Sequence, residues 1–166
     1  RAIDKLNVSR ERNTLIAAVK RGDIAAARTI VSEGRPEVEQ VDFYQPDLKA
    51  AYADPKAFGF GKLGVLENAL DKKATYLAIA MDNGGPRIAL AAPVNDEQGQ
   101  LLSVAYVRLP IKDLIAPITA SAPEGAYISL RQGRHDVAEA GDSLNLRSAI
   151  DINAVEIPGT PLKIIA

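Results

Sequence analysis

Cysteine and tryptophan are absent from the 166-residue sequence, and methionine and histidine occur once each, as Met81 and His135. The lack of cysteine excludes a disulfide framework, a thiolate nucleophile and cysteine-bound zinc. It does not identify the compartment, because exported and cytosolic proteins can both lack cysteine. Aromatic residues make up only 5% of the chain, so many core contacts have to come from close packing of small side chains.

Neither sign of charge dominates, since 20 Lys and Arg stand against 21 Asp and Glu. This balance leaves no basic stripe for nucleic-acid phosphates or an anionic membrane surface, so no nucleic-acid partner is expected. Long apolar runs are also absent. The most apolar stretches, residues 101–109 and 161–166, are far shorter than the ~20 residues that a transmembrane helix needs.

The rest of the composition is typical of a folded domain. Hydrophobic residues account for 47% and charged residues for 25%, and a chain of this length can bury a core without a metal or disulfide. We therefore expect a single domain over residues 1–166. Because the chain begins at Arg1 rather than at methionine, we expect a processed product or an excised piece whose missing flanks could include targeting or membrane segments.

The first part of the sequence has mainly helical spacing. Apolar residues at intervals of three and four predict helices over residues 1–20 and 63–73. The Ala-rich interior of residues 24–33 favours another helix, and residues 48–53 are a candidate for a short one that ends before Asp54-Pro55. Asp23 is a suitable N-cap for the second helix, and Gly34 lies where a left-handed C-cap is expected. A strand that includes Val41 and a Gly-rich loop at residues 59–64 separate these helices.

From residue 75 onward the pattern is mostly that of strands. Alternating residues predict strands over residues 75–81, 87–94, 101–109, 126–131, 135–138 and 161–166. Asn83-Gly84 and Gly133 mark hairpin turns, and Pro110 precedes a predicted helix over residues 111–119. Helices followed by antiparallel strands predict an α+β fold, with a helical segment at 1–34 and an α+β core at 35–166.

One candidate for nucleotide chemistry is the G-x-G-x-x-G pattern of Gly59, Gly61 and Gly64, with Asp82 at the end of the next strand. A dinucleotide site needs a buried strand directly before the first glycine, so that the phosphate meets a helix N-terminus. Residues 53–56, which include Asp54 and Pro55, occupy that place instead. A flexible glycine-rich loop is therefore the preferred interpretation over dinucleotide binding.

Other catalytic patterns are equally weak. His135, the single histidine, lies in a turn segment, and no nucleophile-elbow pattern accompanies it. The carboxylates lack the spacing of an EF-hand or of a His/carboxylate metal site. We therefore predict no catalytic residue, no cofactor and no bound metal.

Small residues suggest a different kind of site. Within the predicted strands, period-two alternation places small side chains on one face and bulky ones on the other; the small residues are Ala78, Ala80, Ala89, Ala91, Ser103 and Ala105. A shallow face accommodates either a closely packed helix or a ligand. For the ligand alternative, the candidate binding residues are Tyr76, Arg87, Ser103 and Tyr127.

Three segments carry a family resemblance: residues 38–43, residues 88–96 with their Pro93-Val94-Asn95-Asp96 sequence, and residues 102–107 after Gly99. Together with a long N-terminal helix they resemble Cache-type extracytoplasmic sensor domains. The resemblance implies a PAS-like antiparallel sheet behind that helix. It also implies a position outside the cytoplasmic membrane, between two transmembrane helices.

A narrower resemblance covers roughly residues 10–140. Residues 34–41, 47–55 and 125–135 resemble the N-terminal extension of certain membrane-bound bacterial phosphomannomutase/phosphoglucomutase proteins. The phosphoserine and magnesium loops of a phosphohexomutase are missing, and Thr119-Ala120-Ser121 only echoes the first. The resemblance thus implies a non-enzymatic segment, with catalysis in an absent C-terminal domain. The arginine, tryptophan and aspartate set of amino-acid-binding Cache domains is also missing.

The expected function is that of an extracytoplasmic, periplasmic sensory or regulatory domain of a membrane protein. Its expected partners are a small molecule on the Ala-lined side of the sheet and the transmembrane helices of the parent chain. One alternative is a ligand-free assembly module that forms a homodimer through the N-terminal helix. Another is a nucleotide-binding enzyme that uses Gly59, Gly61 and Gly64.

Overall fold

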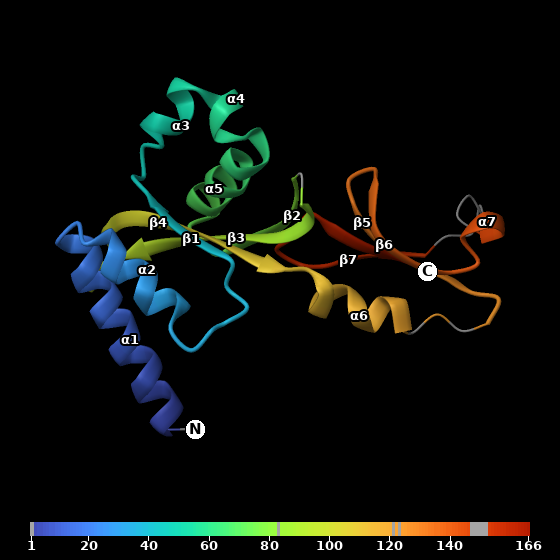
Figure 1. Cartoon of the computed structure of the whole chain (residues 1–166), viewed down its shortest axis with the longest axis horizontal. Coiled ribbons are helices and arrows are strands. Elements are labelled where there is room, and N and C mark those ends of the chain that lie inside the picture. The colour runs from blue at the N-terminus through green and yellow to red at the C-terminus, as the bar shows by residue number, and fades with distance from the viewer. Residues whose placement is uncertain (1, 83, 121, 123, 147–152) are drawn as a thin grey trace. The chain divides into compact units, whose positions relative to one another are not determined.

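The computed structural model describes residues 2–82, 84–120, 122, 124–146 and 153–166. In this part of the chain it shows an α+β fold with two four-stranded antiparallel sheets and seven helices (Figure 1). The chain forms two compact units, of which the first comprises Arg1–Tyr76 and Leu90–Leu109. The second comprises Leu77–Ala89 and Pro110–Ala166. The expectation of a single domain over residues 1–166 stays a prediction.

The first unit contains the helices α1 (Ala2–Lys20), α2 (Ile24–Ser32), α3 (Lys49–Ala53), α4 (Pro55–Phe58) and α5 (Phe60–Lys72). Its strands are β1 (Gln40–Tyr44), most of β4 (Leu101–Pro110) and the second half of β3 (Gly85–Asn95). β1 pairs antiparallel with β4, so that Val41 lies opposite Val107 and Phe43 opposite Ala105. The order of the first sheet is β1-β4-β3-β2, where β2 is Tyr76–Asp82.

Local capping explains where these helices begin. The Asp23 carboxylate accepts a hydrogen bond of 3.0 Å from the Ala26 amide, which confirms the predicted N-cap of α2. Gly34, which follows the C-cap residue Glu33 of that helix, has a φ of 69°, as the predicted left-handed position requires. The Asp54 carboxylate caps α4 in the same way, by accepting from the Ala57 amide, and Pro55 takes the first helical position.

The expected Gly-rich loop at residues 59–64 is wrong. Because Asp54 and Pro55 start a helix, α4 precedes Gly59, and α5 begins at the next residue, Phe60. Gly59 supplies the positive φ of 101° that separates the two helices. Helix α4, rather than a strand, lies directly before Gly59, so the strand–turn–helix unit that a dinucleotide would need is not formed.

The core of the first unit joins α1 to the sheet residues. Ile16, Val94 and Ala105 are buried together, with Val19, Phe43 and Leu102 packed around them. At the end of this helix, Lys20 lies 3.1 Å from the Glu97 carboxylate in the β3–β4 turn. The turn itself is held by buried Asp96, whose Oδ1 accepts hydrogen bonds from the amides of Gln98 and Gln100.

The second unit contains the helices α6 (Lys112–Ala120) and α7 (Ser143–Leu146) and the strands β5 (Tyr127–Gln132), β6 (His135–Gly141), β7 (Ala154–Glu156) and β8 (Leu162–Ile165). These strands form the sheet β6-β5-β8-β7. Its core consists of Ile79, Ile111, Leu130 and Leu162, against which the apolar face of α6 packs. β2 and the first part of β3 also belong to this unit.

The predicted hairpin of β5 and β6 around Gly133 and the last strand at residues 161–166 are confirmed. The sequence did not reveal that they form a sheet of their own. β7 was missed because its three residues are all exposed and show no alternation. Asn83, in the predicted turn between β2 and β3, lies outside the described residues. None of the helices among the described residues is long and apolar enough to cross a membrane.

Candidate functional site

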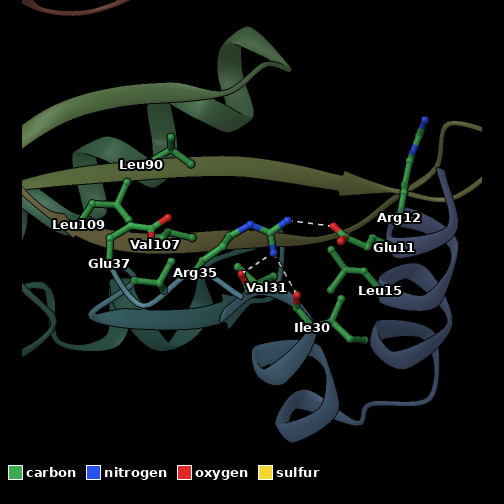
Figure 2. Close-up of a pocket in the computed structure, with 11 residues that line it drawn as sticks. Glu11, Arg12, Leu15, Ile30, Val31, Arg35, Glu37, Leu90, Val107 and Leu109 are labelled. Carbon is green, nitrogen blue, oxygen red and sulfur yellow. Dashed lines mark hydrogen bonds and ion pairs between the residues drawn. The ribbon is translucent and has the colours of Figure 1, made fainter. Parts of the chain in front are cut away.

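A cavity of about 490 Å³ lies within the first unit, where α1, α2 and the segment after α2 face the strands β3 and β4 (Figure 2). Most of its lining is apolar: Leu15, Ile30, Val31, Val38, Leu90, Val107 and Leu109. Four charged residues, Glu11, Arg12, Arg35 and Glu37, complete it. A predominantly apolar cavity of this size with a few polar groups is typical of small-molecule sites.

Arg35 is the central polar group of this cavity. Its Nη1 donates hydrogen bonds to the carbonyl oxygens of Val31 at 2.9 Å and Ile30 at 3.3 Å, in the last turn of α2. Its Nη2 donates to Glu11 Oε2 of α1 at 2.9 Å. Figure 2 shows the guanidinium between these groups. One nitrogen is therefore fixed by the backbone, while the other bonds a carboxylate on a different helix.

The local sequence explains how Arg35 reaches this position. After α2, Gly34 in its left-handed conformation reverses the chain, and the Arg35 amide donates to the Ser32 carbonyl. The Arg35 side chain can then return to the carbonyls that the helix leaves without intrahelical partners. Its positive charge also lies at the negative end of the α2 dipole. Arg35 thus closes α2 and is held in place by it.

The other charged lining residues are arranged around Arg35. Figure 2 shows Glu37 on the side of Arg35 that faces away from Glu11, and Arg12 extending away from the Arg35 guanidinium. Glu11, Arg12 and Glu37 are exposed, whereas Arg35 is half-buried. Among the lining residues that the structure describes there is no histidine, serine or threonine. This arrangement can bind and orient a molecule through its apolar wall and its charged groups.

A second cavity, of about 600 Å³, lies at the end of β1 beside α3. Phe43, Tyr44, Leu48 and Ala51 contribute to its lining. Tyr44 also belongs to a cluster of side chains around Lys62, a residue of α5. The Lys62 ammonium lies 4.2 Å from the centre of the Phe58 ring and donates a hydrogen bond of 3.2 Å to Tyr44 Oη. Lys62 therefore already occupies the aromatic surroundings that could hold a ligand cation.

The environment of Tyr44 disfavours its phenolate. Burial and the nearby Asp42 carboxylate raise the pKa of Tyr44 well above the usual range of tyrosine. Asp42 itself pairs with Arg28 of α2 at 2.9 Å. Tyr44 is therefore a neutral hydrogen-bonding group at physiological pH and not a general base.

The four binding residues proposed from the sequence lie in different units. Tyr76 and Ser103 belong to the first unit and are buried. Ser103 Oγ donates to the Tyr44 carbonyl at 2.8 Å, and the ring of Tyr76 lies 4.5 Å from the Lys72 ammonium. Both side chains thus have structural contacts, and neither contributes to the lining of the two cavities described above.

Arg87 and Tyr127 belong to the second unit. Arg87 Nη1 donates to the carbonyls of Pro86 and Gly84 at the start of β3. Tyr127 is buried and donates a hydrogen bond of 2.6 Å to Glu139 Oε1 across the β5–β6 pair. Burial and this carboxylate raise the pKa of Tyr127. These two residues do not line the described cavities either.

The sequence predicts that the small residues of β3 and those of β4 lie on one shared face of the sheet. This prediction is wrong. Leu90 lines the first cavity together with Val107, and Val94 packs with Ala105. The even-numbered residues of β3 therefore share a face with the odd-numbered residues of β4. Alternation within a strand gives its two faces but not its register against a neighbour. Ala89 and Ala91 are fully buried, so the small residues there are packed against other groups.

Local sequence patterns do not identify the cavity residues. A basic residue just after a helix end, as Arg35 is, commonly bonds the last carbonyls of that helix. Its partner Glu11 lies 24 positions earlier, outside any local pattern. No group of three or more histidine, cysteine, aspartate or glutamate side chains that could bind a metal is found among the described residues. No family model and no curated protein sequence matches the chain.

Proposed function

We propose that the chain is a ligand-binding sensory domain of Cache type that acts on the extracytoplasmic side of a bacterial membrane. In this proposal it regulates a membrane-bound protein resembling phosphomannomutase/phosphoglucomutase. The observation that carries the proposal is the apolar cavity of about 490 Å³ with α1 as one of its walls. A ligand there would contact the N-terminal helix, which in a Cache-type domain leads to the membrane.

Several features of the fold support this proposal. The segments that carry the resemblance correspond to the entry into β1 and to the β3–turn–β4 hairpin, both next to the cavity. Ile16 of α1 packs against Val94 and Ala105 of that hairpin, which is the contact expected of a long N-terminal helix on a PAS-like sheet. A ligand with different affinities for two positions of α1 would shift the population between them.

The alternative of an assembly module has less support in the described side chains of α1. Between residues 10 and 20, the exposed side chains are all polar, whereas Ile16 and Ala18 are buried. A stable dimer through this part of the helix would need an apolar surface to bury. The nucleotide-binding alternative needs a phosphate loop, and residues 60–64 belong to α5 instead.

The proposal is tested by ligand screening with a variant that fills the cavity. Thermal-shift and calorimetric screens of sugars, sugar phosphates and carboxylates should identify at least one compound that stabilises the chain. Leu15→Trp places an indole in the cavity wall and should abolish the binding of that compound. Val155→Trp adds the same group at an exposed position of the second unit and should leave binding unchanged.

A screen without any binder would remove the main support for the sensory function. Binding that survives Leu15→Trp would place the ligand elsewhere.

A further inference from the structure

We propose that the ligand of the cavity beneath α1 and α2 is an apolar monocarboxylate, whose carboxylate group replaces Glu11 on Arg35. This inference rests on the proposed function and specifies the chemical class of its ligand. In the lining of this cavity, the fixed guanidinium of Arg35 lies among seven apolar side chains.

Arg35 is arranged as a receptor for an anion. Two backbone carbonyls of α2 fix Nη1, so the guanidinium keeps its position whether or not Glu11 is bound to Nη2. Fixed orientation lowers the entropic cost of binding an incoming anion. A carboxylate is the natural partner, since a guanidinium can bond both of its oxygens.

Glu11 is the group that a ligand has to displace. Its side chain is 53% exposed and that of Arg35 41% exposed, so solvent weakens their ion pair. The Glu11 side chain makes no other hydrogen bond or ion pair within the described part of the chain. The Glu11 carboxylate can return to water when it leaves Arg35, which keeps its displacement inexpensive.

The rest of the lining determines the body of the ligand. Leu15, Leu90 and Val107 offer apolar contacts and no hydrogen-bonding side chains. Burial of an alkyl chain against them is favourable by roughly 25 cal/mol per Å². A sugar or a second carboxylate would lose its hydration there without a replacement partner. Glu37, which lies on the side of Arg35 away from Glu11 in Figure 2, disfavours a ligand with a second negative charge.

The exchange also changes a contact of the N-terminal helix. In the free protein Glu11 links α1 to the segment that follows α2. With a ligand bound, Arg35 holds the ligand and α1 loses this link. The ligand therefore acts on the helix through a specific pair of residues.

The test uses calorimetry on the 166-residue chain with four probes of equal length: octanoate, octanol, octylamine and the dicarboxylate suberate. Octanoate should bind with about tenfold or higher affinity than octanol and octylamine, since a hydrogen-bonded ion pair is worth a factor of that order. It should also bind more tightly than suberate, whose second carboxylate would lose its hydration among apolar side chains. Arg35→Gln should reduce octanoate affinity about tenfold or more. Glu11→Gln should raise it several-fold, because the competing carboxylate is gone.

Glu37→Gln is the matched control for Glu11→Gln, as it removes the same charge from the same lining without freeing Arg35. It should change octanoate affinity less than Glu11→Gln does. If Arg35→Gln does not fold, Arg35→Lys keeps the charge without the planar fork and should still weaken binding. Circular dichroism and thermal unfolding verify the fold of each variant.

The outcomes separate this inference from the proposed function. Octanol or octylamine binding as tightly as octanoate, or octanoate binding that is indifferent to Arg35→Gln and Arg35→Lys, would overturn the carboxylate assignment and leave a ligand-binding cavity. Binding of a sugar or sugar phosphate that Leu15→Trp abolishes, without octanoate binding, would do the same. If no probe and no compound of the wider screen binds, the inference and the sensory function fail together.

Discussion

The side-chain amide of Gln132 pairs with both backbone polar groups of Ile79. Gln132 Oε1 accepts from the Ile79 amide at 2.8 Å, and Gln132 Nε2 donates to the Ile79 carbonyl at 2.9 Å. Ile79 lies in β2, which is an edge strand of the first sheet. Within the second unit, the amide of Gln132 thus takes the place of one residue of a neighbouring strand.

The first prediction concerns this pair. Gln132→Ala leaves two backbone groups of buried Ile79 without their partners, so we expect a loss of about 1–3 kcal/mol in the free energy of unfolding. Hydrogen exchange should show faster exchange of the Ile79 amide. Gln98→Ala, at an exposed glutamine, is the control and should change neither quantity. An unchanged Ile79 exchange rate would contradict the role assigned to Gln132.

The second prediction concerns the two bonds of Arg35. Glu11→Gln removes only an exposed ion pair, for which about 0–1 kcal/mol is expected. Arg35→Met also removes the hydrogen bonds to the Ile30 and Val31 carbonyls, so it should cost about 1–3 kcal/mol. Urea unfolding of both variants measures the difference. Equal losses would mean that the carbonyl bonds contribute nothing to stability.

Much of the fold is encoded in local patterns of the sequence. The Asp23 cap and the hairpin at Gly133 are formed as their residues predict, since each depends on contacts a few positions apart. The α4–α5 boundary was mispredicted because Gly59, Gly61 and Gly64 favour a loop by composition. In the structure, capping by Asp54 and the flanking helical residues outweigh that preference.

The candidate site could not be predicted from local sequence patterns. Its defining contact joins Glu11 to Arg35, 24 positions apart. The hydrogen bonds between Ile79 and Gln132 in the second unit join residues 53 positions apart. Such contacts follow from the arrangement of whole elements rather than from local propensity. The register of β3 against β4 likewise decides that Leu90 and Val107 share a face. Sequence alternation alone left that register undetermined.

The third prediction concerns alkaline stability. The pKa of Tyr44 is raised in the folded chain by burial and by Asp42. Above the ordinary tyrosine pKa of about 10, the unfolded chain therefore loses this proton while the folded chain keeps it. Stability from this group is full below that pH and falls as pH rises further.

Urea unfolding between pH 8 and pH 11, roughly the range around that ordinary pKa, measures this effect. The Tyr44→Phe variant should lose stability less steeply with rising pH than the parent chain. Asp42→Asn should lower the pKa of Tyr44, which absorbance titration of the phenolate can follow against Tyr44→Phe. Parallel stability curves for the parent and Tyr44→Phe would contradict the raised pKa.

The fourth prediction compares two glycines of the second unit that both have positive φ. At Gly141, with a φ of 88°, an added Cβ would collide with the backbone carbonyl of Ala126, which also accepts the Asp142 amide hydrogen bond. At Gly159, with a φ of 75°, an added Cβ would meet no atom within 4 Å. Both positions carry left-handed strain when substituted, but only Gly141 adds a steric overlap.

Gly159→Ala should therefore cost about 1–2 kcal/mol, the penalty of a left-handed non-glycine residue. Gly141→Ala should cost about 2–5 kcal/mol, because the overlap adds to that penalty and forces β5 and β6 apart at their ends. Thermal and urea unfolding of the two variants provide the comparison. Since the backbone strain is common to both, their difference isolates the contact with Ala126. Equal losses would show that the chain relaxes around Gly141 at no cost.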